Sequence, residues 1–383
     1  MCVIGFQQEN EKIGNLCGMS VKLKSLGAIT EPSTANVQTH RAVAIAVKRQ
    51  GMPKILAASF FYAVAWLIVF GAAIALPSLE DICCFGVLGV KHQILEAAPS
   101  PKIILTGGSN VLFGIDSETI GKAFDRKVVD MGLCLMFPLS YLFEEIKDNI
   151  KPGDIVVLSP EYSSYSREFE HSIIMADILD GYPRAIEWVL RCNGCSWDEK
   201  GKILFHLRTL GLQKLTYTIT HLRQIAQHRC KWSYNKPNPG LAVLNESNLN
   251  NCGDLTWHLK QKVGKDAMER KILIRVPKQI DSYTIGEING FDKFCKAHGA
   301  QFVLIPPSIP DSMYKKSKND IDSIVDQAKN RLSIPVLASA DRYAFPDEQI
   351  FGGHYHLDKV GREIRTQRMI EDLRSTVQAS RSH

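Results

Sequence analysis

The stretch from Lys102 to Phe124, KIILTGGSNVLFGIDSETIGKAF, decides the fold. Its apolar start is typical of a buried strand, and the residues from Ser117 to Phe124 have helical spacing. Between them, Gly107 and Gly108 allow a tight turn that leaves Ser109 exposed near the amides of the next helix. Ligands of an open parallel sheet bind beyond the carboxyl ends of its strands, so we expect the functional site at this turn.

Strand and helix signals alternate beyond this stretch, which favours a mostly parallel sheet flanked by helices. We predict strands at 102–106, 127–132, 155–160, 301–307 and 334–339, and helices at 117–124, 139–150, 282–298, 320–332 and 358–373. Residues 161–275 contain long amphipathic stretches and are interpreted as a mainly helical insertion or cap. The predicted class is therefore α/β, a three-layer doubly wound domain built from residues 100–160 and 276–375, with a disordered tail at 376–383.

The segment from Ile55 to Leu76 contains no charged side chain over 22 positions. As a helix it would be about 33 Å long, so it predicts a transmembrane signal anchor rather than a buried core helix. Basic residues precede it and acidic residues follow it, and basic flanks stay on the cytoplasmic side. We expect a disordered cytoplasmic tail at 1–54, a single-pass membrane localisation and an extracytoplasmic main domain, periplasmic or at the cell surface. Met52 begins a run typical of a native start, so the residues before it are hypothesised to be an extension.

The positive charge of the chain lies mostly before this segment. The first 54 residues contain seven Lys or Arg against three acidic residues, and the remainder contains 39 against 37. This distribution argues against nucleic-acid binding by the main domain. Glu144 and Glu145 are interpreted as surface residues of an amphipathic helix.

The sequence favours neither a metal nor a cofactor. The glycine-containing turn lacks the GxxxxGKS and GxGxxG patterns of nucleotide-binding loops. Ten cysteines are scattered along the chain, and CNGC, with Cys192 and Cys195, is its one CxxC pair. No second pair or matching histidines complete a zinc site, so we expect a local disulfide or free thiols there.

A serine nucleophile needs a base within hydrogen-bond reach and donors for the oxyanion. The stretch FGGHYHLDKVGREIRT, from Phe351 to Thr366, places His356 directly before the last predicted helix, from which it can reach the carboxyl edge of the sheet. We predict that His356 is the general base for Ser109. His354 is interpreted as a structural residue.

Three motifs, GGSNVLFGIDSETI, VVDMGL and YHLDKVGREIRT, resemble the SGNH/GDSL hydrolase superfamily, in particular its membrane-anchored branch linked to cell-surface polysaccharide. The resemblance covers residues 102–160 and 282–373, about half of the chain. It implies a flavodoxin-like SGNH-type fold, with Ser109 as nucleophile and His356 as the residue that takes and returns its proton. The amides of Ser109 and Gly132 would form the oxyanion hole, with Asn110 as one position for its asparagine.

The resemblance also implies an aspartate three or four residues before the histidine, where this chain has Gly353 and Gly352. Asp347, Asp341 or Asp358 could substitute for the orienting acid, as could a backbone carbonyl. The expected activity is that of an esterase or O-acyltransferase acting on an acylated surface glycan or lipid-linked saccharide, beside membrane-bound polysaccharide assembly partners. The alternative is a catalytically impaired protein that serves as a glycan-binding or assembly scaffold, because loss of the orienting acid costs a serine protease about four orders of magnitude in rate.

Overall fold

The computed structural model describes residues 54–69, 71, 76, 85–167, 174–192, 195–226, 246–261, 275–353 and 355–381. The chain divides into two compact units. One consists of residues 1–76 and 211–219, and the other contains residues 77–210 and 220–383. The sheet and every residue of the candidate site belong to the second, larger unit.

A parallel sheet forms the centre of the larger unit. Its strands lie in the order β2-β1-β3-β4, and each neighbouring pair is parallel. Their bounds are β1 (Lys102–Gly107), β2 (Lys127–Asp130), β3 (Ile155–Ser159) and β4 (Gln301–Leu304). A parallel bridge from Leu304 to Val336 continues the sheet beyond β4, within the strand predicted at 334–339. The predicted α/β class with a mostly parallel sheet is confirmed, and the arrangement is compatible with a flavodoxin-like fold.

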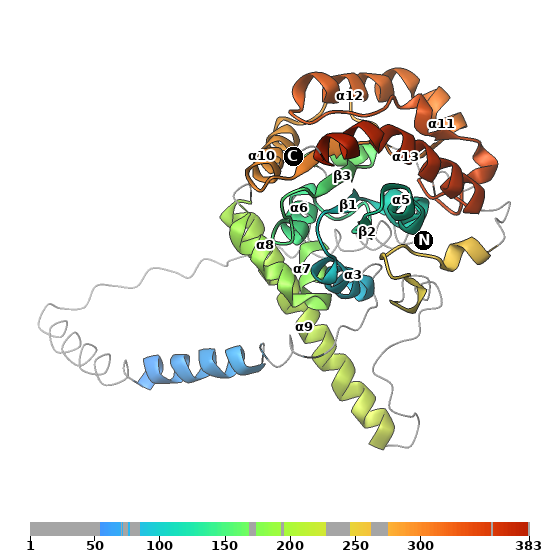
Figure 1. Cartoon of the computed structure of the whole chain (residues 1–383). Coiled ribbons are helices and arrows are strands. Elements are labelled where there is room, and N and C mark those ends of the chain that lie inside the picture. The colour runs from blue at the N-terminus through green and yellow to red at the C-terminus, as the bar shows by residue number, and fades with distance from the viewer. Residues whose placement is uncertain are drawn as a thin grey trace, which may run out of the picture. The chain divides into compact units, whose positions relative to one another are not determined.

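Helices cover both faces of the sheet. Figure 1 shows α6 (Leu139–Lys147) and α10 (Ser282–Ala297) on one side, and α5 (Ser117–Phe124) and α13 (Lys359–Arg381) on the other. This distribution follows from the strand order, because the right-handed crossovers from β1 to β2 and from β2 to β3 run in opposite directions across the sheet. With both faces covered, β1 and β3 are buried along their whole length, as their continuous apolar runs predict.

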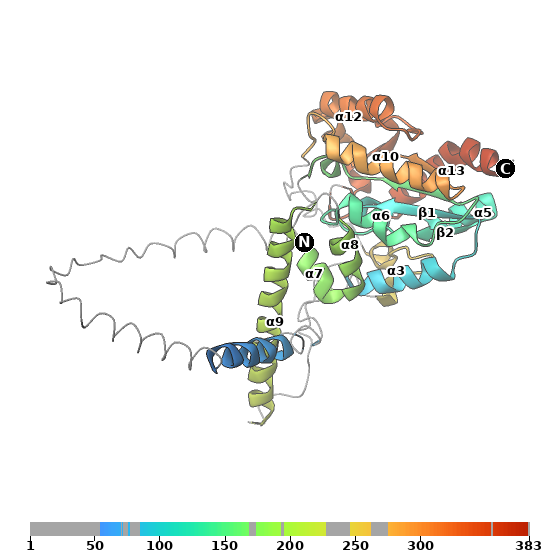
Figure 2. The same cartoon turned by 90° about the vertical axis from the view of Figure 1, so that its left-hand side faces the viewer.

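The described residues form further helices and strands besides this three-layer centre. Helix α3 (Phe85–Ala97) lies beside α7 (Ile174–Gly181) in both views (Figures 1 and 2). The other elements are α4 (Ser109–Gly114), α8 (Ile186–Arg191), α9 (Trp197–Ala226), α11 (Asp311–Lys316), α12 (Lys318–Arg331), β5 (Ile309–Pro310) and β6 (Ala344–Phe345). The 3₁₀ turns are η1 (Tyr162–Tyr165), η3 (Pro183–Ala185), η5 (Glu246–Asn248), η6 (Trp257–Lys260), η8 (Asp341–Tyr343) and η9 (Asp347–Gln349).

Helix α5 shows how local sequence sets the layer that positions the site. Asp116 caps its first turn by accepting a hydrogen bond from the Thr119 amide at 3.2 Å. Ile120 and Phe124 then face the core cluster that also contains residues of β1, β3 and α13. The helix ends where Asp125 takes a left-handed conformation, with φ at 51°.

The C-terminal end of the chain differs from the prediction. Residues 376–383 were expected to form a disordered tail, yet α13 continues to Arg381. Thr376 and Val377 are buried, and Val377 belongs to the main core cluster. The expectation is wrong for residues 376–381 because the apolar face of the helix continues past the predicted end at residue 373.

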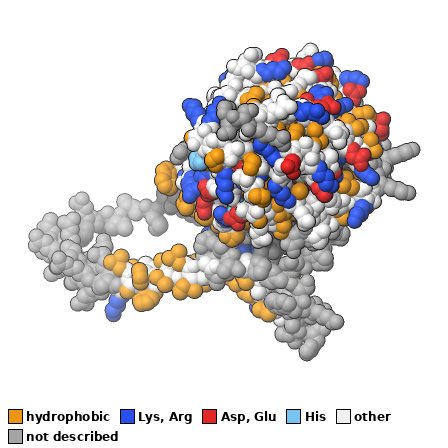
Figure 3. Space-filling view, viewed as in Figure 1, with side chains coloured by type: hydrophobic (Ala, Val, Ile, Leu, Met, Phe, Trp, Pro, Cys, Tyr) orange, Lys and Arg blue, Asp and Glu red, His pale blue; other side chains and the backbone are white. Residues whose placement is uncertain are grey.

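The predicted membrane anchor lies only partly within the described residues. Residues 54–69 are helical and expose large apolar side chains, among them Leu56, Phe60 and Phe61 (Figure 3). In the described parts of the chain, no helix is both long and apolar enough to span a bilayer. The end of the predicted segment, at 70 and 72–75, lies outside the described residues, as do Met52 and the tail before it. The anchor and its orientation therefore stay predictions.

Candidate functional site

Ser109 begins a short helix, α4, immediately beyond the carboxyl end of β1. Its side chain is only partly buried, and its Oγ donates a hydrogen bond of 2.7 Å to Oε1 of Glu161. The sequence pattern did not predict α4, because a six-residue helix contains too few turns to show a period. The helix nevertheless places the serine hydroxyl at the edge of the sheet where ligands of parallel folds bind.

Glu161 lies two residues beyond β3, and only 1% of its surface is exposed. Besides the Ser109 hydroxyl, it accepts a hydrogen bond of 3.1 Å from the Asn110 amide. Burial raises the pKa of Glu161 to about 7, because desolvation outweighs the hydrogen bonds from Ser109 and Asn110 that lower it. The group bonded to the predicted nucleophile can therefore gain or lose a proton near neutral pH.

Gly107 and Gly108 are required because the end of β3 and the residues after it lie very close to the chain there. A Cβ at Gly107 would lie 2.2 Å from the Ser159 carbonyl oxygen, and one at Gly108 would lie 2.7 Å from Oε1 of Glu161. Neither distance is compatible with a side chain. The glycines thus allow Glu161 to reach the serine, which the sequence-based interpretation attributed only to a turn that exposes Ser109.

Asn110 links α4 to β3 and α13. Its buried side chain accepts hydrogen bonds from Arg365 Nη2 at 2.7 Å and from Ser159 Oγ at 3.0 Å, while its Nδ2 donates to the Ser159 carbonyl at 2.9 Å. Arg365 also bonds the Asn110 carbonyl and Ser159 Oγ. These contacts fix the start of α4. A role for Asn110 in oxyanion binding stays a prediction, since its side chain already has these partners.

Gly132 lies two residues beyond β2, where the chain passes very close to α4. A Cβ at this position would be 2.6 Å from the Leu112 amide nitrogen. The Gly132 amide donates a hydrogen bond of 2.7 Å to Oδ1 of Asp130, which also forms a fully buried ion pair of 2.8 Å with Lys91. The amide predicted to bind an oxyanion thus has an internal carboxylate acceptor in this structure.

The segment 246–261, which the resemblance did not cover, lies beside β2. The Asp130 amide donates to the Cys252 carbonyl at 2.8 Å. Asp254 is buried and accepts hydrogen bonds from the Ser117 amide and from Arg362 Nη2, each at 3.0 Å. Burial raises the pKa of Asp254 to about 6, with a smaller contribution from the charge of Asp130.

Buried charges of both signs therefore lie along the chain from the start of α4 to the start of α5. The carboxylates are those of Asp130, Glu161 and Asp254, and the cations are those of Lys91, Arg362 and Arg365. The lysine and both arginines hydrogen-bond to groups of the site, as buried charges require. Burial lowers the pKa of Arg365 to about 10, which leaves it charged at neutral pH.

His356 reaches the same helix through Phe113. The two rings are stacked, with centroids 4.0 Å apart and planes 9° apart. Ser109 and Phe113 are four residues apart on α4, so they lie on one face of the helix. The fold thus brings His356, which is distant in the sequence, into contact with the short helix that begins at Ser109.

A second histidine, His258, packs against the same phenylalanine. Its ring lies 5.0 Å from that of Phe113 and 5.4 Å from that of Phe351. The side chain is 1% exposed, and burial lowers the pKa of His258 to about 4. It is therefore neutral at physiological pH, and the sequence pattern gave no signal for it because it lies outside every recognised motif.

The turn before His356 explains the glycines found where an acid was expected. Ile350 and Leu357 form an antiparallel bridge, and the Phe351 amide donates to the His356 carbonyl at 2.9 Å. Within this tight turn Gly352 has φ of +62°, a conformation that side chains disfavour. A Cβ at Gly353 would lie 3.0 Å from Nδ1 of His356. Position 354, interpreted as a structural histidine, lies outside the described residues.

The acids proposed as substitutes have local roles of their own. Asp347 Oδ1 accepts a hydrogen bond of 3.1 Å from the Ser312 amide. Asp358 accepts one of 2.8 Å from the Gly361 amide in the first turn of α13. Asp341 interacts with the side chain of Ser339, which lowers its pKa. An orienting role for Asp347 stays a prediction.

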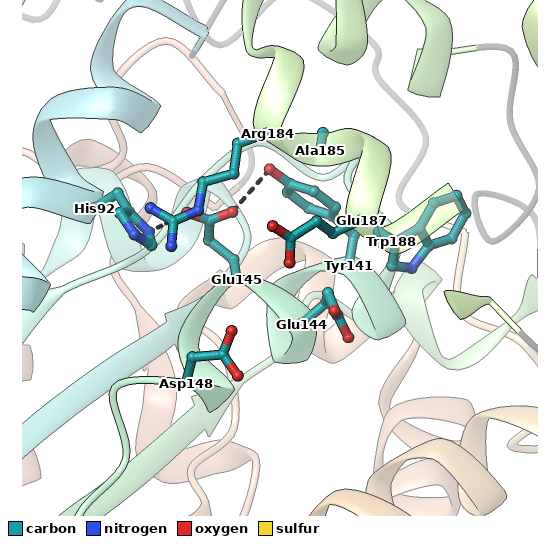
Figure 4. A pocket seen from close by; sticks show the side chains of 9 residues that line it. All are labelled: His92, Tyr141, Glu144, Glu145, Asp148, Arg184, Ala185, Glu187 and Trp188. Carbon is teal, nitrogen blue, oxygen red and sulfur yellow. Dashed lines mark hydrogen bonds and ion pairs between the residues drawn. The ribbon is translucent and has the colours of Figure 1, made fainter. Parts of the chain in front are cut away.

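A separate pocket lies between α3, α6 and the segment formed by η3 and α8 (Figure 4). Glu145 was expected on the surface, but it is 8% exposed and accepts a hydrogen bond of 2.6 Å from Nδ1 of His92. The hydroxyls of Tyr141 and Tyr182 donate to it at 3.1 and 3.2 Å. The expectation is wrong because α3 covers this face of α6. The hydrogen bond to Glu145 also raises the pKa of His92.

The described residues include a disulfide and two free thiols. Cys192 and Cys195 form a disulfide, which is one of the two states expected for the CNGC pair. Cys252 and Cys295 are buried free thiols. Within the described ranges, no group of three or more His, Cys, Asp or Glu side chains is arranged to hold a metal ion.

A scan against protein-family models finds no match for this chain, and a search of curated proteins finds none with significant similarity. The resemblance to the SGNH/GDSL superfamily therefore depends on the three sequence motifs. Any functional conclusion must depend on the chemistry of the residues around Ser109.

Proposed function

We propose that this chain is an SGNH-type serine esterase or O-acyltransferase with Ser109 as its nucleophile. The observation that carries the proposal is the hydrogen bond from the Ser109 hydroxyl to a buried carboxyl group that titrates near pH 7. A serine becomes a useful nucleophile only when a base can take its proton. The hydroxyl is also partly exposed at the carboxyl edge of a parallel sheet, where an ester can approach.

His356 supports the same activity. Its ring is stacked one helical turn from Ser109, against Phe113, which suits a group that exchanges protons with the substrate or its leaving group. The amides of Ser109, Gly132 and Asn110 contribute to an oxyanion hole only if a substrate oxygen displaces the acceptors that they have here. These acceptors are Glu161 for Ser109 and Asn110, and Asp130 for Gly132.

The proposed substrate is an acylated surface glycan or a lipid-linked saccharide, reached by an extracytoplasmic domain that the helix containing residues 54–69 anchors in a membrane. The disulfide between Cys192 and Cys195 supports an oxidising compartment. The exposed apolar side chains of residues 54–69 support the anchor. Polysaccharide assembly proteins of the same membrane are the proposed partners.

Labelling of the full-length chain with a fluorophosphonate, together with hydrolysis of p-nitrophenyl acetate, tests the proposal. Ser109→Ala should abolish both, because it removes the proposed nucleophile. Ser140→Ala is the matched control, since Ser140 is a buried serine whose Oγ accepts a bond from Trp188 in a different cluster. Wild-type protein that neither labels nor hydrolyses the ester contradicts the proposal.

A second candidate function is a non-catalytic glycan-binding or assembly scaffold. Two observations favour it: the amides of Gly132 and Asn110 already donate to internal carboxylates, and glycines replace the orienting acid. This candidate predicts saccharide binding that Ser109→Ala leaves unchanged, in a wild-type protein that fluorophosphonate never labels. Isothermal titration with acetylated and deacetylated oligosaccharides, on both proteins, separates it from the first.

A further inference from the structure

We propose that Glu161, rather than His356, is the group that takes the proton from Ser109. This inference rests on the proposed function and adds to it a catalytic carboxylate that none of the three motifs contains. It replaces a serine–histidine pair supported by a distant acid with a serine–glutamate pair, in which the acid contacts the nucleophile directly.

The serine proton points toward Glu161. A serine hydroxyl has one hydrogen, and that of Ser109 is donated to Oε1 of Glu161 over 2.7 Å. A base must be within hydrogen-bond reach of the proton that it removes, and 2.7 Å satisfies that requirement. The proton is thus placed on the path to Glu161 before any substrate binds.

Neighbouring backbone groups hold Glu161 in contact with Ser109. Glu161 is also held by the Asn110 amide at 3.1 Å, so its carboxyl group has a fixed orientation. A side chain at position 108 would collide with Oε1 of Glu161. A carboxylate positioned in this way needs no orienting acid, which accounts for the glycines at 352 and 353.

The electrostatic surroundings of Glu161 set its pKa near neutral pH. The charged or titratable groups that influence Glu161 are Arg365 on α13 and the buried phenol of Tyr355. The charge of Arg365 lowers the pKa of Glu161 less than burial raises it, which leaves the carboxyl group with a pKa of about 7. A base is most effective when its pKa is close to the working pH.

The proposed steps conserve protons and electron pairs. Ser109 Oγ bonds to the acyl carbon while its proton moves to a Glu161 oxygen, and that proton passes to the alkoxide as the bond to the leaving alcohol breaks. Water, or an acceptor hydroxyl in acyl transfer, then bonds to the acyl carbon and gives its proton to Glu161. The proton returns to Ser109 Oγ as the acyl–serine bond breaks.

Structural anchoring of α4 is the competing role for Glu161, and a glutamine separates the two. Glu161→Gln keeps an acceptor for the Asn110 amide and the Ser109 hydroxyl but removes the base. Glu145→Gln is the matched control, because Glu145 is also a buried glutamate bonded to a hydroxyl, that of Tyr141.

The experiment measures the rate constant of fluorophosphonate labelling from pH 5 to pH 9 for wild type, Glu161→Gln, Glu145→Gln and His356→Gln. We expect the wild-type rate to rise with pH, with its midpoint near 7, as Glu161 loses its proton. Glu161→Gln should label at least about 100-fold more slowly and lack this rise, since general-base catalysis contributes 10²- to 10⁴-fold. Glu145→Gln should keep both the wild-type rate and the rise. His356→Gln should keep the rise with its midpoint near 7, whatever its overall rate.

Three results overturn the inference, and they are distinguishable. Equal rates and profiles for wild type and Glu161→Gln defeat the catalytic role of Glu161 alone. A rise that disappears in His356→Gln and persists in Glu161→Gln returns the role to the histidine. A wild type that never labels defeats the proposed function and this inference with it. If Glu161→Gln does not fold, as judged by circular dichroism, the profile of His356→Gln decides between the two bases.

Discussion

Two buried glutamates, Glu161 and Glu145, accept hydrogen bonds from hydroxyl groups, yet their surroundings differ. Glu145 is bonded by two tyrosines and by His92, a base that can carry a compensating positive charge. Glu161 is bonded by a serine and a backbone amide, and within the described part of the chain it forms no ion pair. Glu145 thus links α6 to α3 through His92, whereas Glu161 contacts the proposed nucleophile directly.

The largest expected effect concerns the buried arginine on the Glu161 side. Arg365→Met should lower the free energy of unfolding by about 3 to 5 kcal/mol, because it removes a buried cation bonded to Asn110 and Ser159. Arg184→Met, on the Glu145 side, should cost about 1 kcal/mol or less, because its ion pair with Glu96 is exposed. Urea unfolding monitored by tryptophan fluorescence measures both. Equal losses of unfolding free energy would mean that Arg365 and Arg184 stabilise their surroundings to a similar extent.

The pH dependence of stability should distinguish the two glutamates next. The folded-state pKa of Glu161, about 7, lies above its ordinary value of 4.5. The contribution of Glu161 to the free energy of unfolding is therefore fully present below pH 4.5. It decreases by roughly 3 kcal/mol as the pH rises through 7. The pKa of His92 is also raised, so the His92–Glu145 contribution is present below pH 6.5 and is lost above it.

Unfolding curves of wild type, Glu161→Gln and Glu145→Gln at each pH unit from 4 to 9 check this difference. The gap between wild type and Glu161→Gln should change between pH 4.5 and 7. The gap between wild type and Glu145→Gln should change above pH 6.5. Two gaps that change over the same pH range would contradict the assignment of separate roles.

At pH 7 the two glutamine variants should also differ in stability. Glu145→Gln should lower the free energy of unfolding by about 2 kcal/mol, because it weakens a charged hydrogen bond of 2.6 Å to His92. Glu161→Gln should remain within about 1 kcal/mol of wild type, since glutamine can accept both of its hydrogen bonds. Thermal unfolding measures the two values side by side. A larger loss for Glu161→Gln would indicate that its main role is structural.

The smallest effect concerns the turn where the acid was expected. Gly352→Ala should cost about 1 kcal/mol, because φ of +62° places its Cβ in an unfavourable conformation although nothing lies within 4 Å of it. Gly286→Ala, in α10, is the matched control. It also has open space around its Cβ but a helical backbone, so it should stabilise the protein by about 0.5 to 1 kcal/mol. If both variants changed the free energy of unfolding by the same amount and in the same direction, the conformation of Gly352 would not be what excludes an acid.

Much of the framework was predictable from the sequence, because its elements have strong periods. The apolar runs of β1 and β3 and the stripe of α10 could be located within a few residues. The helical spacing from Ser117 to Phe124 gave the bounds of α5. These features depend on residues that are close together in the sequence, so the sequence alone indicates them.

The partners within the site could not be predicted in the same way. Glu161 directly follows the strand predicted at 155–160, but its contact with Ser109, 52 residues away in the sequence, depends on the pairing of β1 with β3. Glu145 was placed on the surface because nothing in α6 shows that α3 covers it. Contacts between distant segments therefore account for most of what the sequence did not indicate.

Mass-spectrometric mapping of the fluorophosphonate adduct tests the central claim most directly. The account predicts a single adduct on Ser109 in the wild-type chain, formed at least about 100-fold more slowly in Glu161→Gln at pH 8. An adduct on any other residue, or no adduct on the folded wild-type protein, would contradict it.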